Sequence, residues 1–138
     1  MGIKVSTGGG GGQHFFKPDD GMFVLEFVGF EETTKKAFNS EEIVPAWRWN
    51  FKMYHFDTKL PVIDAETGEP AVYSDRVNRS LDTRSNAYSR FAALLAREIE
   101  AGEDSDDLFR EAVGKRCGGN FMGGWLKTTM RMPAGMLV

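Results

Sequence analysis

The sequence predicts a mostly β protein with one or two helices, and three local patterns indicate this. Residues 46–56 (AWRWNFKMYHF) alternate between two sets of side chains, which is the period of a β-strand. Residues 80–102 place apolar side chains at the three- and four-residue spacing of a helix. Gly123-Gly124 separates two short segments, as in a two-residue hairpin turn.

Length and composition favour one folded domain. With 138 residues, of which 41% are hydrophobic and 27% charged, the chain has the balance of an ordinary globular domain. We expect residues 1–14, which include five consecutive glycines, to form a flexible leader and residues 15–138 to form the domain. No apolar run approaches the roughly 18 residues of a membrane span, and the single Cys117 fits a reducing compartment. A cytoplasmic protein with no membrane association is therefore predicted.

Three strands are expected in the first half of the domain. The first covers residues 22–35, where Gly29 indicates a bulge, and a polar loop over 35–45 leads to the second at 46–56. Residues 58–70 hold two prolines and a Thr-Gly turn, so this connection is expected to fold back as a small hairpin. A third strand is predicted over 71–79, and its pattern does not assign its two faces.

The helical pattern follows the third strand. Within residues 80–102 the apolar stripe consists of Tyr88, Phe91, Ala92, Leu95 and Ile99. Asp82 or Thr83 is the expected N-cap, and Gly102 is the expected stop. A shorter helix is predicted over 104–114, with its acidic residues in the first turn, where the helix dipole favours them.

The last elements are two strands, 115–122 and 125–132, joined at Gly123-Gly124. The resulting order, β-β-β-α(α)-β-β, is that of an OB-fold, a small five-stranded barrel with its helix between the third and fourth strands. We therefore predict a five-stranded OB-fold-like barrel. The main helix is expected to plug one end with Tyr88, Phe91, Leu95 and Ile99.

The second strand should turn its aromatic set inward. Burying the cations Arg48 and Lys52 unpaired would cost several kcal/mol each, far more than the alternative of exposing a tryptophan. The inward set is then Trp47, Trp49, Phe51 and Met53, and the outward set is Arg48, Asn50, Lys52 and Tyr54.

The final strand is divided in the same way. Its expected inward residues are Leu126, Thr128, Met130 and Met132, which leaves Trp125, Lys127, Thr129 and Arg131 outward. Two strands would then each carry an aromatic ring beside two cations on their outer sides, which is the chemistry of sequence-tolerant single-strand binding. The alternative is a merely solvated sheet face, because Lys, Arg, Thr and Tyr are common on exposed strands. The predicted nucleic-acid-binding residues are Arg48, Asn50, Lys52, Tyr54, Arg76, Arg79, Trp125, Lys127 and Arg131.

A family resemblance accompanies these patterns. The segment RVNRSLDTRSNAYSRFAALLAREI, followed by VGKRC and a closing hairpin, resembles small OB-fold proteins encoded by bacteriophages and prophages. The matching features are Ser80-Leu81, Arg84-Ser85, the Leu94-Leu95 pair and Gly114-Lys115, and the similarity covers residues 22–133. The resemblance implies single-stranded-DNA binding in phage or prophage replication or recombination, in the host cytoplasm.

Neither catalysis nor a cofactor is expected. His14, His55 and Cys117 lack metal-ligand spacing, and no nucleophile motif is present. Cys117 follows Lys115-Arg116, which could activate it, but a small buried side chain is favoured. The expected partners are single-stranded DNA and proteins of replication or recombination, with self-association left open. The alternative function is a protein-interaction or virion-structural module, which the net charge of −3 favours.

Overall fold

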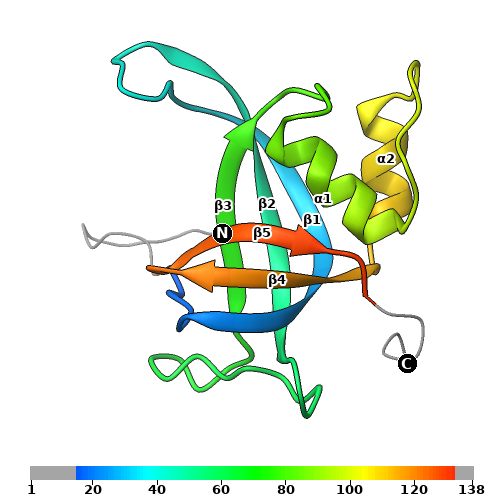
Figure 1. Ribbon diagram of the computed structural model, residues 1–138. Helices are drawn as coiled ribbons and strands as arrows, with labels where there is room; N and C mark the ends of the chain where they lie inside the picture. The colour runs from blue at the N-terminus through cyan, green and yellow to red at the C-terminus, as the bar shows by residue number, and fades with distance from the viewer. Residues whose placement is uncertain (1–14, 133–138) are drawn as a thin grey trace, which may run out of the picture.

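The computed structural model describes residues 15–132, and the leader predicted for residues 1–14 lies outside the described residues. The fold is mostly β, with five strands and two helices (Figure 1). Along the chain they are β1 (Gly21–Lys36), β2 (Ile43–His55), β3 (Val72–Asn78), α1 (Asn86–Leu95), α2 (Ser105–Ala112), β4 (Arg116–Met122) and β5 (Trp125–Met130). This order confirms the prediction.

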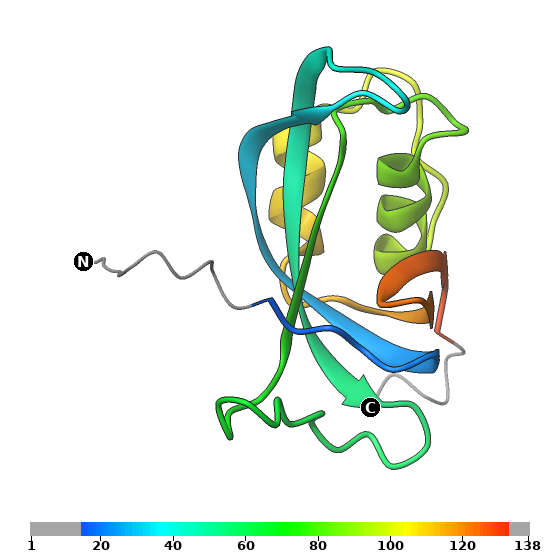
Figure 2. The ribbon, with the colours of Figure 1, turned by 90° about the vertical axis from the view of Figure 1, so that its left-hand side faces the viewer.

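All five strands form one antiparallel sheet in the order β3-β2-β1-β4-β5. The predicted bulge is confirmed, because the register of β1 against β2 shifts between Phe27 and Gly29. Before this bulge β1 pairs with both β2 and β4, and after it β1 pairs with β2 alone. As a result β4 and β5 cross the front of the molecule at a steep angle to β2 and β3 (Figure 1). Figure 2 shows α1 and the β4–β5 hairpin stacked on the same side of β1, β2 and β3.

The sheet does not close into a barrel, so this part of the fold prediction is not met. Strands β3 and β5 are its two edges, and within the described residues no backbone ladder joins them. Their connection runs through a side chain, since the backbone N–H of Leu126 donates to the hydroxyl of Tyr73 at 3.0 Å. A tyrosine side chain can bridge a gap wider than the spacing of about 4.8 Å between paired strands. The open seam is therefore bridged without strand pairing.

The predicted faces of β2 are confirmed. Trp47, Trp49, Phe51 and Met53 are buried, whereas the alternate residues Arg48, Asn50, Lys52 and Tyr54 are half-buried or exposed. On the inward side the rings gather around Phe109 of α2, which stacks on Phe30 with ring centroids 3.8 Å apart. Phe109 also contacts Trp49 at 4.9 Å and Phe91 at 4.8 Å, so both helices pack on the aromatic face of the sheet.

Helix α1 is shorter than predicted, and the face that it buries is shifted around the helix axis from the predicted one. Ser85 caps it by accepting a hydrogen bond from the N–H of Tyr88 at 3.1 Å, in place of Asp82 or Thr83. The helix ends at Leu95, where Ala96 is left-handed, well before Gly102. Its buried residues are Ala87, Arg90, Phe91, Ala93 and Leu94. Of the predicted stripe, Phe91 is buried, Leu95 and Ile99 are half-buried against the core, and Tyr88 and Ala92 are half-buried, so the stripe is confirmed only in part. The apolar pattern did not include Arg90, because the pattern counts only apolar side chains.

The remaining elements differ from prediction mainly in β5. The helix predicted over 104–114 is confirmed as α2, with Asp104 as N-cap and two acids in its first turn. Gly123 and Gly124 both have positive φ, as the predicted hairpin turn requires. In β5, Trp125, Lys127 and Arg131 are exposed as expected, but Thr128 and Met130 are exposed as well. The predicted inward set is thus wrong at these two positions, because an edge strand is incompletely covered.

A buried ion pair links α1 to β3. Arg90 is only 4% exposed, and its Nη1 and Nη2 donate to the two carboxylate oxygens of Asp75 at 2.7 and 2.6 Å. Its guanidinium lies 5.3 Å from the ring centroid of Trp49 and 5.8 Å from that of Phe51. The hydroxyl of Tyr73 donates to the same carboxylate at 2.8 Å. Because the hydroxyl of Tyr73 also accepts a hydrogen bond from the backbone N–H of Leu126 in β5, one hydrogen-bond network joins α1, β3 and β5.

We expect Arg90→Met to lower the free energy of unfolding by about 3–5 kcal/mol, because it leaves the carboxylate of Asp75 buried and unpaired. Urea denaturation measures the change. Arg84→Met is the matched control, since Arg84 also pairs with an aspartate but its side chain is 91% exposed. That control should change stability by less than about 0.5 kcal/mol. Equal losses in the two variants would contradict the structural role of the network.

Candidate functional site

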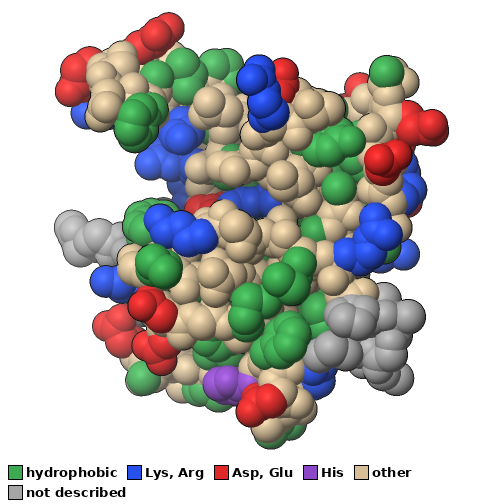
Figure 3. All heavy atoms as spheres, in the orientation of Figure 1, with side chains coloured by type: hydrophobic (Ala, Val, Ile, Leu, Met, Phe, Trp, Pro, Cys, Tyr) green, Lys and Arg blue, Asp and Glu red, His purple; other side chains and the backbone are tan. Residues whose placement is uncertain are grey.

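A cleft of about 390 Å³ lies between β3 and the β4–β5 hairpin. The open seam of the sheet creates it, because no strand within residues 15–132 fills the space beyond the Tyr73–Leu126 bridge. Figure 3 shows the hollow at the left edge of the molecule, with Lys or Arg side chains gathered on its upper wall. The residues that line it are Phe15, Phe16, Lys17, Arg48, Tyr73, Ser74, Asp75, Arg76, Gly123, Gly124 and Trp125.

The first wall consists of two arginines on neighbouring strands. Arg48 of β2 pairs in register with Arg76 of β3, on the outward face of both strands. The Nη1 of Arg76 donates to the carbonyl of Thr34 at 2.9 Å, and neither arginine forms an ion pair with another residue of the described range. Like charges directly across a ladder repel each other. An anion bound beside them would relieve that repulsion.

The second wall is the start of β5. Trp125 follows the Gly123-Gly124 turn directly and is 59% exposed, as its position in the sequence led us to expect. A large exposed indole has apolar area to gain from a ligand. The two walls therefore offer a stacking surface and positive charge to the same ligand.

The floor of the cleft has its polar groups already engaged. Asp75 accepts bonds from Arg90 and Tyr73 with both carboxylate oxygens. Burial, reinforced by the nearby charge of Asp75, raises the pKa of Tyr73 well above its usual value. Tyr73 therefore stays a neutral phenol that donates to Asp75 and accepts from Leu126. The floor shapes the cleft, and its walls carry the free groups.

The structure brings only three of the nine predicted site residues, Arg48, Arg76 and Trp125, into this cleft. Asn50 lies next to it, and its Oδ1 accepts from the hydroxyl of Ser74 at 2.5 Å. Lys127 lines a separate depression between β5 and α1.

The other four predicted residues lie apart from the cleft. Arg79 donates to the carbonyls of Ala46 and Thr33 at 2.9 and 2.7 Å, so it fastens the β1–β2 hairpin. The ring of Tyr54 packs under the guanidinium of Arg116 at 4.3 Å. Lys52 is exposed farther along β2, and Arg131 is exposed beyond the end of β5.

Sequence reasoning missed two groups of residues. Glu31 and Glu26 of β1 lie across from Arg48 and Lys52, so acids border the cationic row on its β1 side. Phe15 and Lys17 line the cleft from the segment before β1. The run Phe15-Phe16-Lys17 was the available signal, because it combines two rings with a cation directly after the glycine-rich leader.

The reactive groups considered from the sequence have structural roles. Cys117 is buried, and desolvation raises the pKa of its thiol to about 12, so it remains protonated at neutral pH. Arg116, which could have activated it, pairs with Glu26 at 3.0 Å. Within residues 15–132 no group of three or more His, Cys, Asp or Glu side chains could hold a metal ion. Among the described helices, neither has the length and apolar character to cross a membrane.

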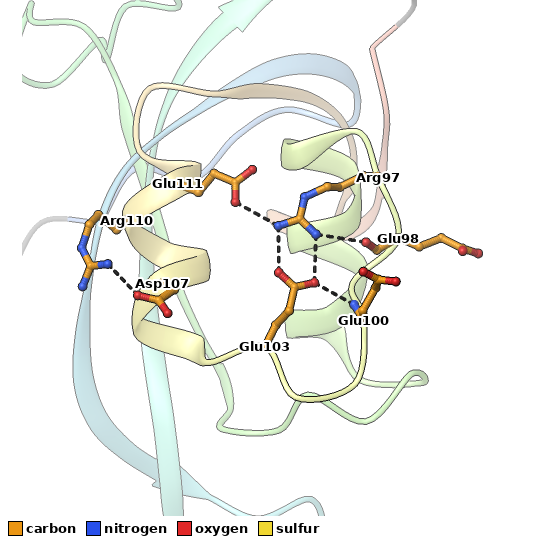
Figure 4. Close-up of polar contacts among 7 residues, drawn as sticks. All are labelled: Arg97, Glu98, Glu100, Glu103, Asp107, Arg110 and Glu111. Atoms are coloured by element: carbon orange, nitrogen blue, oxygen red, sulfur yellow. Dashed lines mark hydrogen bonds and ion pairs between the residues drawn. The ribbon is translucent and has the colours of Figure 1, made fainter.

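A second charged cluster fastens the helices to each other (Figure 4). The guanidinium of Arg97, just after α1, donates to both carboxylate oxygens of Glu103 at 2.9 Å and to Glu111 of α2 at 2.9 Å. Glu103 also accepts from the backbone N–H of Glu100 at 2.7 Å. These hydrogen bonds, Arg97 first, lower the pKa of Glu103 from 4.5 to about 2. The cluster orders the α1–α2 connection on the side of α1 away from the cleft.

Comparison with models of known protein families finds no match, and a search of curated proteins finds no similar sequence. The resemblance to phage-encoded OB-fold proteins therefore stays a prediction, and the assignment of function depends on the cleft.

The depressed pKa of Glu103 predicts a specific acid response. Its ionised form is favoured in the folded protein, so its contribution is complete above pH 4.5 and is lost as the pH falls towards 2. Glu103→Gln should lower Tm at pH 7, and the difference from wild type should shrink between pH 4.5 and pH 2. Thermal denaturation at several pH values measures this. Glu98→Gln is the control, because the Glu98 side chain points away from Arg97 (Figure 4); a constant Tm difference for Glu103→Gln would contradict the assignment.

Proposed function

We propose that the protein binds single-stranded DNA in the cleft between β3 and the β4–β5 hairpin, with little dependence on base sequence. The observation that carries this is the pairing of an exposed indole, Trp125, with two neighbouring arginines, Arg48 and Arg76, around one cleft. Unpaired bases stack on aromatic rings, and cations hold the phosphates that connect them. Both kinds of group lie on the walls, and neither arginine forms an ion pair within residues 15–132.

The charge distribution favours a single strand over a duplex. A duplex presents two continuous phosphate backbones, so it is attracted to an extended basic surface. Here the net charge is −3, and Glu26 and Glu31 border the cationic row. A single strand needs only a few phosphate contacts when its bases contribute stacking of about 1–3 kcal/mol each.

The arrangement of the strands supports a proposal about the fold, which accompanies the proposed function. The β-β-β-α-α-β-β order and the β3-β2-β1-β4-β5 sheet are compatible with an OB-type barrel whose last seam is left open. In such a barrel β3 and β5 would pair, and here Tyr73 links them instead. We propose an open OB-like sheet acting in phage or prophage replication or recombination, where single strands arise.

A protein-interaction role is the second candidate, and exposed apolar side chains favour it. Phe38 at the β1–β2 loop and Leu60 and Ile63 in the β2–β3 connection are all exposed. The first test below separates the two candidates, because a protein-binding module has no affinity for an oligonucleotide.

Tryptophan fluorescence tests the proposed binding. Trp47 and Trp49 are buried, so an oligonucleotide that quenches the protein must act on Trp125. We expect oligo-dT to quench the emission, and Trp125→Ala to abolish the quenching while weakening affinity by about 1–3 kcal/mol. With cations from Arg48, Arg76 and Lys17, log Kobs should fall against log salt with a slope of about −2. Wild-type protein that does not bind oligo-dT at low salt would overturn the proposal in favour of the protein-interaction role.

A matched pair of substitutions tests where the phosphates lie. Arg48→Gln removes a cation from the cleft, and Lys52→Gln removes one from the same face of β2 outside it. We expect Arg48→Gln to weaken binding and to reduce the salt slope by about 0.7, the value for one phosphate contact on a single strand. Lys52→Gln should leave both nearly unchanged. Equal effects of the two variants would show that the strand follows β2 rather than the cleft.

A further inference from the structure

The segment before β1, residues 15–20, is fastened across the tip of the hairpin. Oδ1 of Asp20 accepts a hydrogen bond from the backbone N–H of Gly123 at 2.9 Å. The stem of Lys17 packs so closely on Gly124 that a Cβ there would lie 2.7 Å from two of its carbons. Phe16 packs against the core, and Pro18 is buried. This segment therefore forms a fixed third wall of the cleft.

Phe15 differs from its neighbours in this wall. It lines the cleft, yet it is 54% exposed, so it adds little to the core. The guanidinium of Arg48 lies 5.8 Å from its ring centroid, which is within the range of a cation–π contact. The ring is thus placed beside the cation that we assign to phosphate binding, and it leaves apolar surface open.

We infer that Phe15 is a second stacking surface of the cleft, and that one unpaired base is held between Phe15 and Trp125 with its phosphate at Arg48. The inference rests on the proposed function and adds a binding residue and a ligand unit to it. A cleft of about 390 Å³ lies at the lower end of the volumes of ligand pockets, which matches a bound unit of about one nucleotide. Two rings on one base also select against paired DNA, whose bases have no free face.

The experiment measures the affinity of full-length protein for fluorescently labelled oligo-dT by anisotropy at low salt. Phe15→Ala should weaken binding about 5- to 100-fold, the effect of losing one stacking contact. Phe15→Tyr should retain affinity, because the ring is kept, and Phe15→Leu should behave as the alanine variant does. Phe38→Ala is the matched control, since Phe38 is another exposed phenylalanine (91%) that lies in the β1–β2 loop and does not line the cleft.

The double variant Phe15→Ala, Trp125→Ala tests whether both rings serve the same base. If they do, the loss caused by Phe15→Ala should be smaller when Trp125 is already absent. Fully additive losses, or a Phe15→Leu variant with wild-type affinity, would overturn the shared-base arrangement. If wild-type protein binds oligo-dT and Phe15→Ala binds it with the same affinity as Phe38→Ala, the inference about Phe15 is overturned and the proposed function stands. Wild-type protein without any affinity would instead remove the proposed function.

Discussion

The ion pair between Arg90 and Asp75 is the interaction on which the open side of this fold depends. Two buried charges cost several kcal/mol to desolvate, and they are tolerated only when their hydrogen-bonding groups are satisfied. Here a bidentate contact, the hydroxyl of Tyr73 and the ring of Trp49 meet that requirement. Because Tyr73 also holds Leu126, the same pair fixes the distance between the two sheet edges.

A seam bridged by side chains has a chemical consequence that a paired seam would lack. Backbone pairing would fill the gap between β3 and β5, whereas the tyrosine bridge leaves a cleft above it. The bridge also saturates the polar groups of the floor, since Asp75 and Tyr73 make their hydrogen bonds within the network. A ligand in the cleft therefore meets few free groups that could read a base edge. The interactions that the cleft can offer are therefore mainly stacking and charge attraction, and these do not distinguish one base from another.

Local patterns predicted the parts of the fold that local physics determines. The alternation around Trp49 and the Gly123-Gly124 turn follow from strand period and positive φ alone, and both are confirmed. The buried face of α1 was predicted only in part, because the partner that permits burial of Arg90 lies on another element, fifteen residues away. The candidate site was only partly predicted for the same reason. Phe15 reaches the cleft through contacts of its segment with the β4–β5 hairpin, more than a hundred residues away.

The acidic residue Glu31 of β1 limits the route of the nucleic-acid strand that we propose. Glu31 lies across from Arg48, so a phosphate on the β1 side of Arg48 would meet a carboxylate. Glu26 lies across from Lys52 and is paired with Arg116. On the β3 side the neighbour of Arg48 is Arg76, and the cleft follows directly. Along this row the charge therefore changes from positive at Arg76 and Arg48 to negative at Glu31. A negative net charge is compatible with the proposed binding of a single strand, because cations and rings are concentrated around the cleft and Glu31 disfavours a path over β1.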